Sequence, residues 1–136
     1  MGRGREIFRF IKKGHFFSRV HVEDIANAII ISMKKITPGE IFNICDDLPS
    51  QSDVVVKYAA KLMNIKNIQT INFDSSELNK KTKSFYLDNK RVKNKKIKKI
   101  LEWTPKFRTY KLGLDNLFKL ITNENSFANP SFSKKN

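Results

Sequence analysis

Two adjacent acids, Asp46 and Asp47, are the best-placed residues for binding chemistry in this sequence. They follow the apolar run Ile41–Cys45, which has the composition of a strand. Ligands of open α/β sheets collect at the carboxyl ends of strands. Adjacent Asp residues are equally common in turns. The pair is therefore predicted to belong to a binding site, with a plain turn as the open alternative.

The two histidines and the single cysteine do not form a recognisable catalytic or metal-binding set. Neither His15 nor His21 has another ligand at an i, i+4 spacing, and no cysteine cluster accompanies them. Cys45 lies in an apolar run, which predicts a buried small residue. Gly2-Arg3-Gly4 resembles the start of a dinucleotide fingerprint, but no strand precedes it and Ile7 occupies the position of the third glycine. We therefore predict no catalytic, cofactor-binding or metal-binding residue in this chain.

The patterns of apolar residues predict which elements hold these side chains. Strand composition predicts strands at His15–Val22 and Glu40–Asp46, and a further short strand at Asn67–Phe73. Helical periodicity predicts helices at Val22–Met33, Ser52–Met63, Val92–Leu101 and Thr109–Thr122. Two basic segments are ambiguous: Glu6–Lys13 is a short helix or an irregular lead-in, and Asp74–Ser84 is a loop or a frayed helix.

The order of these elements indicates the fold class. Strands that alternate with helices predict a βαβ unit, and hence an α/β fold with short parallel strands and several helices. Two such strands are too few for an independent sheet, so the chain has the character of a part of something larger. Its 136 residues suffice for one domain, assigned to residues 1–123. Residues 124–136 lack periodicity and are predicted to be a disordered tail.

Charge and composition restrict the partners and the compartment. The formal net charge is +14, which would suit a nucleic-acid partner. Lysine is far commoner than arginine, however, and is spread over several segments, so nucleic acid is not the favoured partner. One cysteine cannot form an intrachain disulfide, and the basic N-terminus is not followed by a long apolar stretch. These features predict a cytoplasmic protein without a membrane-spanning segment.

Several short motifs occur in a fixed order along residues 1–121. The run FSRVHVEDIA at Phe17–Ala26 fits the pattern HV-x-D-[IL]-A, and GEIFNI at Gly39–Ile44 fits G-x-x-[FY]-N-[IV]. The run LEWTP at Leu101–Pro105 fits LGW-x-P, with Glu102 in place of the glycine. This ordered set resembles the C-terminal, substrate-side part of the extended short-chain dehydrogenase/reductase superfamily, and specifically its NAD-dependent epimerase/dehydratase family.

The resemblance implies a Rossmann-type NAD(P)-binding protein of which this chain is only the C-terminal part. The glycine fingerprint and the Tyr-x-x-x-Lys pair of that family are absent here; Tyr58 and Lys61 have two residues between them rather than three. Tyr58 is instead assigned to the apolar stripe of its helix. NAD or NADP is expected for the full-length family and neither for this chain alone, which is predicted to be inactive by itself.

The resemblance also implies a substrate site, formed by Arg19, His21, Asp46 and Asp47, for a small and possibly sugar-like molecule. Many sugar-nucleotide epimerases have a diphosphate-binding Arg four positions before the histidine, where this chain has Phe17, which argues against a nucleotide sugar. The expected partner is the missing Rossmann half. Two alternatives stay open: a basic nucleic-acid-binding module, and a truncated remnant without independent function.

Overall fold

A parallel pair of strands forms the sheet of the computed structural model, which describes residues 7–74 and 78–127. Strand β1 (Ile7–Ile11) pairs with β2 (Ile68–Asn72), with Ile7 opposite Ile68 and Ile11 opposite Asn72. Between them in the chain come helices α1 (Val22–Lys34) and α2 (Ser52–Leu62). After β2 come α3 (Lys80–Phe85), α4 (Lys95–Ile100) and α5 (Tyr110–Phe127). The predicted α/β class with short parallel strands is confirmed.

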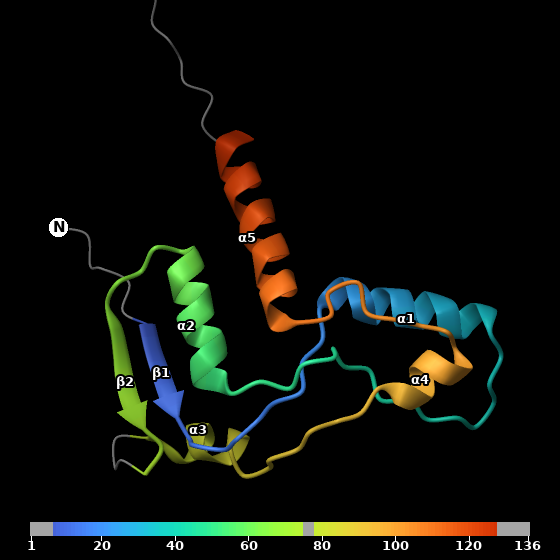
Figure 1. Ribbon diagram of the computed structural model, residues 1–136, viewed down its shortest axis with the longest axis horizontal. Helices are drawn as coiled ribbons and strands as arrows, with labels where there is room; N and C mark the ends of the chain where they lie inside the picture. Colours follow the sequence, from blue (N-terminus) through green and yellow to red (C-terminus); the bar gives the residue numbers. More distant parts are fainter. Residues whose placement is uncertain (1–6, 75–77, 128–136) are drawn as a thin grey trace, which may run out of the picture.

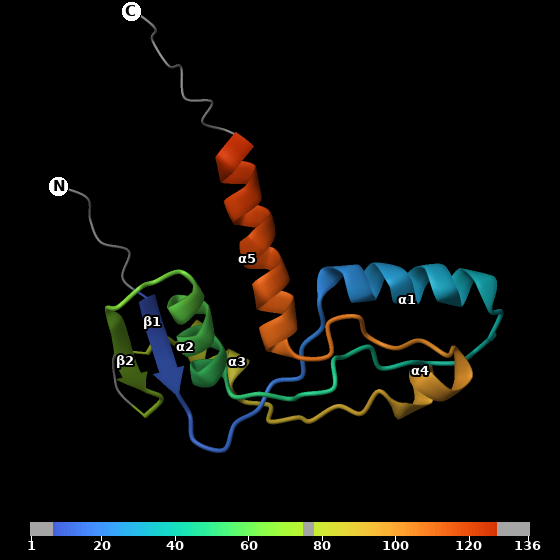
Figure 2. The same ribbon diagram turned by 45° about the horizontal axis from the view of Figure 1, so that its top comes forward.

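The elements form two parts that are joined by extended segments of chain (Figure 1). One part contains β1, β2 and α2, with α3 beyond the end of the strands. The other contains α1 and α4. Helix α5 rises from the junction between the two parts and contacts α2, and the turned view in Figure 2 shows the same arrangement. Segments far apart in sequence therefore meet at the junction.

A small apolar core joins α1 to α4. It consists of Ala28, Ile97, Leu101 and the fully buried Trp103. The Trp103 indole N–H donates to the main-chain oxygen of Asp24 at 3.2 Å. Because this buried donor is satisfied by the first turn of α1, the core also fixes where that helix begins.

The start of α1 is stabilised by several independent contacts. His21 is the N-cap, and its Nδ1 accepts a hydrogen bond from the amide of Glu23 at 3.2 Å. Asp24 is fully buried, and its two carboxylate oxygens accept the amides of Lys106 and Phe107 at 2.7 and 3.0 Å. Carboxylates in a first turn also interact favourably with the helix dipole. The HVED sequence therefore holds both the helix and the loop before α5.

Two of the predicted strands are wrong. Residues 15–21 and 40–46 are extended, but they are joined only by isolated contacts. The amide of Asp46 donates to the oxygen of Arg19 at 2.6 Å, and Phe17 and Ser50 form a single antiparallel bridge. A strand needs a continuous ladder with a neighbour, and no described residue supplies one here. These two segments have the residue composition of strands, but no ladder of hydrogen bonds joins them to a neighbouring strand among the described residues.

The helix prediction for the lead-in is also wrong. Residues predicted as a short helix or an irregular segment, Glu6–Lys13, contain β1 instead. Their strand state depends on β2, about sixty residues later in the chain, which the sequence predicted at Asn67–Phe73. The parallel pair is thus confirmed, but it joins different segments from those expected.

The remaining helices agree with the periodicity, with shifted ends. Helix α3 occupies the end of the ambiguous segment Asp74–Ser84, of which residues 75–77 lie outside the described residues, and α4 begins at Lys95 rather than Val92. Helix α5 continues to Phe127, into the predicted tail, because neither glycine nor proline interrupts the sequence there. The rest of that tail, residues 128–136, lies outside the described residues, as does Gly2-Arg3-Gly4.

Candidate functional site

Three of the four predicted site residues line one cavity at the junction of the two parts. Arg19 and His21 come from the extended segment that leads into α1, and Asp46 comes from the extended segment beside it. The hydrogen bond between the backbones of Asp46 and Arg19 holds these two segments together. The cavity has a volume of about 220 Å³. Residues 27 positions apart in the sequence therefore face the same space.

Arg19 combines a tethered guanidinium with unused donors. Its Nη1 donates to the main-chain oxygen of Ser50 at 2.9 Å and more weakly to that of Phe17 at 3.3 Å. Burial lowers the pKa of Arg19, and the nearby charge of Asp46 opposes this effect. Arginine nevertheless stays protonated at neutral pH. Its Nε and Nη2 have no hydrogen-bond partner in the part of the chain that the structure describes, so they can serve a ligand.

Asp46 places a partly satisfied carboxylate in the same cavity. It is 5% exposed, and its Oδ1 accepts the amide of Leu48 at 3.0 Å. Burial raises the pKa of Asp46, while the Leu48 hydrogen bond and the charge of Arg19 lower it. Its Oδ2 has no hydrogen-bond partner among the described residues. The cavity thus offers free donors from Arg19 and a free acceptor from Asp46.

His21 contributes a wall of the cavity in a defined tautomer. Since Nδ1 accepts the Glu23 amide, the ring proton of the neutral form is on Nε2. The ring stacks on Phe107, with centroids 3.9 Å apart. Its other neighbour is Gly113, where an added Cβ would lie 3.2 Å from His21 Cδ2. The Nε2 atom is buried and has no partner among the described residues.

The rest of the lining is mostly apolar and comes from the start of α1 and the residue before His21, from α2, from the loop before α5 and from α5 itself. It consists of Val20, Val22, Val55, Phe107, Thr109, Tyr110, Gly113, Leu114 and Leu117. Helical periodicity predicts no functional role for these residues, because it does not distinguish a cavity wall from a core. The one signal that could have singled out Gly113 is a glycine inside a helical pattern, which often has a packing reason.

Asp47, the fourth predicted residue, does not line this cavity. Its carboxylate accepts hydrogen bonds from Asn94 at 2.8 Å, from Arg108 at 2.9 Å and from Lys98. Burial alone would raise the pKa of Asp47, but these three hydrogen bonds outweigh it and lower the pKa to about 2. The neighbouring aspartates therefore differ: Asp46 faces the cavity, and Asp47 connects α4 to the loop before α5.

Other residues considered from the sequence have structural contacts. The Nε2 of His15 is bonded to the main-chain oxygen of Asp88 at 2.8 Å, and its ring lies against Phe17 and Tyr86. Cys45 is buried, and burial raises the pKa of its thiol. The Phe17 ring therefore belongs to an aromatic cluster with His15 and Tyr86.

Within the described residues, no helix is long and apolar enough to cross a bilayer.

Comparison with known proteins identifies the fold. No protein-family model and no curated protein matches the chain. A solved structure of a functionally unknown conserved protein from Silicibacter pomeroyi DSS is 40% identical, with a TM-score of 0.81 over 85% of this chain and 42% of that one. The dTDP-glucose 4,6-dehydratase from Bacillus anthracis str. Ames, solved in complex with NAD, is 20% identical, with a TM-score of 0.67 over 91% and 37% of the two chains.

A further match is the UDP-N-acetylglucosamine 4-epimerase from Bacillus cereus, 13% identical, with a TM-score of 0.65 over 87% of this chain and 36% of the epimerase. The chain therefore spans less than half the length of each of these structures. The part that it matches is the C-terminal one. The likeness expected from the sequence motifs is confirmed at the level of the fold: this chain has the fold of the C-terminal part of NAD-dependent epimerase/dehydratase-type, Rossmann-type NAD(P)-binding proteins.

Proposed function

We propose that this chain is the substrate-side part of an NAD(P)-dependent epimerase/dehydratase or oxidoreductase, and that it binds a small polar substrate but is inactive alone. The observation that carries the proposal is that Arg19 and Asp46 line the same cavity, each with unused hydrogen-bonding atoms. Sites of this kind are mostly apolar, with a few polar groups that fix the orientation of the ligand. The cavity has this composition.

The chemistry of the cavity suits a sugar-like ligand. A hydroxyl group both donates and accepts hydrogen bonds, so adjacent hydroxyls can accept from the Arg19 guanidinium and donate to the Asp46 carboxylate. The valines, leucines and Phe107 of the wall can pack against the C–H groups of the same molecule. Because Asp46 contributes a negative charge and Phe17 replaces the expected arginine, a neutral sugar fits better than a diphosphate here.

In this account the residues of the chain bind and orient the substrate. Arg19 and Asp46 fix two hydroxyl positions, His21 holds the start of α1 and the wall beside Phe107, and the apolar lining excludes water. Positioning of this kind makes a large contribution to catalysis. NAD or NADP would supply the hydride chemistry from the Rossmann half. Asp47, which lies outside the cavity, would orient the Asp46 loop indirectly.

The outer face of α1 is the surface that the Rossmann half would cover. Val22, Ile29, Ile30 and Met33 on this helix are more than half exposed, and Ile36 just beyond it is 87% exposed. A contiguous apolar patch of this kind marks an interaction surface. The extended segment 40–46 beside it lacks a ladder partner within the described residues. We assign both to contact with a Rossmann half in a cytoplasmic protein.

Titrations of the full chain followed by two-dimensional amide NMR test this proposal. Glucose, galactose and mannose are the probes, with NAD and NADP in parallel. The expected result is that at least one sugar shifts the amides around Arg19, Asp46 and Gly113, while neither cofactor shifts these amides. Arg19→Gln should abolish the sugar shifts, and the exposed Arg108→Gln should retain them. Shifts of these amides by NAD or NADP, or sugar shifts that survive Arg19→Gln, would contradict the proposal.

A further inference from the structure

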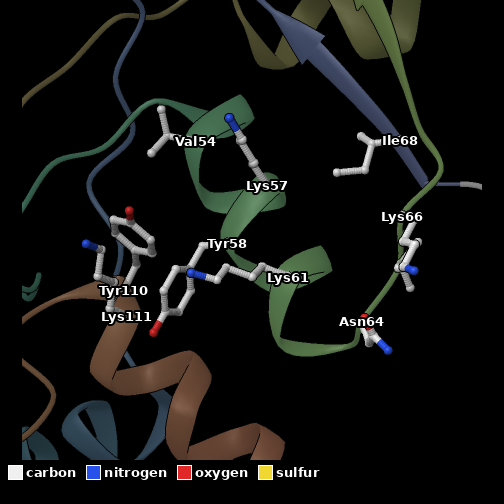
Figure 3. Close-up of a pocket in the computed structure, with 10 residues that line it drawn as sticks. Val54, Lys57, Tyr58, Lys61, Asn64, Lys66, Ile68, Tyr110 and Lys111 are labelled. Atoms are coloured by element: carbon white, nitrogen blue, oxygen red, sulfur yellow. The ribbon is translucent and has the colours of Figure 1, made fainter.

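A second cavity, separate from the proposed substrate site, has a strongly basic lining. It has a volume of about 500 Å³ and lies between α2, the turn before β2 and the first turn of α5 (Figure 3). Four lysines line it: Lys57, Lys61, Lys66 and Lys111. Tyr58 and Tyr110 lie among them, and Tyr110 is shared with the Arg19 cavity on the other side. Ligands of α/β sheets usually bind at the opposite, carboxyl ends of the strands.

The fold brings these lysines together from three places. Lys57 and Lys61 are one turn apart on α2, so they lie on the same side of that helix. Asn64 ends the helical turn with a φ of 53°, which returns the chain toward β2 and places Lys66 across from Lys61 (Figure 3). Lys111 lies in the first turn of α5, where its Nζ is 5.7 Å from the centroid of the Tyr58 ring.

None of the four lysines forms an ion pair with a carboxylate in the part of the chain that the structure describes. The lysines that form ion pairs with carboxylates are Lys35, Lys90, Lys96, Lys98 and Lys106. Asp115 accepts a hydrogen bond from the hydroxyl of Tyr58 at 2.7 Å. Like charges that line one cavity repel one another. A multiply charged anion in that space would relieve the repulsion.

The aromatic and apolar surfaces of the cavity indicate a second property of its ligand, an organic portion beside the negative charge. Tyr58 and Tyr110 meet edge to face, with centroids 5.7 Å apart, and Val54 and Ile68 extend the apolar surface. The Tyr58 hydroxyl is directed to Asp115, so the tyrosine contributes its ring rather than its hydroxyl to the cavity. An inorganic ion would leave this surface unused. The lining suits an anion with an organic portion.

From these contacts we infer that the lysine cavity binds an organic diphosphate or polyphosphate. The phosphates lie among the lysine ammonium groups, which bind phosphate as point charges. The organic portion packs on Tyr110 and Val54. The volume of the cavity is within the range of about 300–1,000 Å³ that small-ligand sites occupy. This inference is independent of the proposed substrate site, since it uses neither Arg19 nor Asp46.

Isothermal titration of the full chain with inorganic pyrophosphate and with adenosine diphosphate tests the inference. Both should bind saturably at near-physiological salt, and the diphosphate with an organic portion should bind more tightly. The double variant Lys57→Gln/Lys61→Gln should weaken both by about tenfold, since each exposed charge pair contributes up to about 1 kcal/mol. The matched control is Lys95→Gln/Lys99→Gln, which removes the same charge at the same spacing from α4 and should leave both affinities unchanged.

Three results would overturn the inference. The first is the absence of saturable binding for both probes. The second is an equal loss in the two double variants, which would indicate only the net charge of the chain. The third is competition by single-stranded RNA in which affinity rises with RNA length, because this would assign the lysines to a nucleic-acid path instead. Sugar binding at the Arg19 cavity is unaffected by any of these outcomes, so the two proposals fail separately.

Discussion

Replacement of Asp24 by alanine is the perturbation for which the structure gives the clearest magnitude. The side chain is 1% exposed, and its two oxygens accept the backbone amides of Lys106 and Phe107. Removal of the carboxylate leaves two donors without partners in a largely dry environment. Each such donor costs about 1–3 kcal/mol, so Asp24→Ala is expected to lower the free energy of unfolding by about 2–6 kcal/mol. That is a large part of the stability of a domain of this size.

Urea unfolding followed by tryptophan fluorescence measures this loss directly. Trp103 is the only tryptophan, is fully buried, and is bonded to the main-chain oxygen of Asp24 rather than to the carboxylate that the substitution removes. The neighbouring acid supplies the control. Glu23 forms an exposed ion pair with Lys106, so Glu23→Gln should change the free energy of unfolding by less than about 1 kcal/mol. If Asp24→Ala costs no more than Glu23→Gln, the proposed link between α1 and the loop before α5 is refuted.

Four further outcomes follow from the same contacts. Asp47→Asn should lower the free energy of unfolding at pH 7 by about 1 kcal/mol after allowance for solvent screening. Because folding lowers the pKa of the Asp47 carboxyl, its contribution to stability is present above pH 4 and is lost as the pH falls toward 2. Urea titrations at several pH values measure this loss. Ile30→Gln/Met33→Gln should reduce light scattering by the isolated chain without lowering its melting temperature, whereas a lower melting temperature would place this face in the core. In an exposed helix, Gly→Ala usually raises the free energy of unfolding by about 1 kcal/mol. Gly113→Ala should not give this increase, because the new Cβ would lie against the His21 ring. A melting temperature raised by the full amount would mean that the His21 ring moves aside at no cost. Binding of mixed-sequence RNA, measured by fluorescence anisotropy, should vanish at physiological salt, and persistence there would favour the nucleic-acid alternative.

Local patterns were sufficient to predict much of the fold. Helices α1 and α2 carry apolar stripes with acidic residues in their first turns, so their own sequences define them. Strands depend on partners elsewhere in the chain. The segment Ile7–Ile11 forms a strand because of β2, whereas 40–46 has strand composition but no ladder among the described residues. Pairing of this kind is not visible in a local window.

The sites were predictable to different degrees. The motif around His21 and the acids after Cys45 indicated the cavity that Arg19 and Asp46 line. The different directions of Asp46 and Asp47 depend on Asn94, Lys98 and Arg108, which lie 47, 51 and 61 residues after Asp47 in the sequence. The lysine cavity had no sequence signal, since lysines are common throughout this chain and only the fold shows which ones line the cavity.

Sequencing the DNA upstream of the Met1 codon shows whether a Rossmann half belongs to the same protein. We expect an in-frame coding sequence for a Rossmann domain of about 150 residues, with a glycine fingerprint opening its first helix and a Tyr-x-x-x-Lys pair. That result would supply the half that covers α1 and holds NAD or NADP. A stop codon with no such coding sequence, upstream or in a neighbouring gene, would rule out the substrate-side role proposed for this chain and favour a remnant without catalytic function.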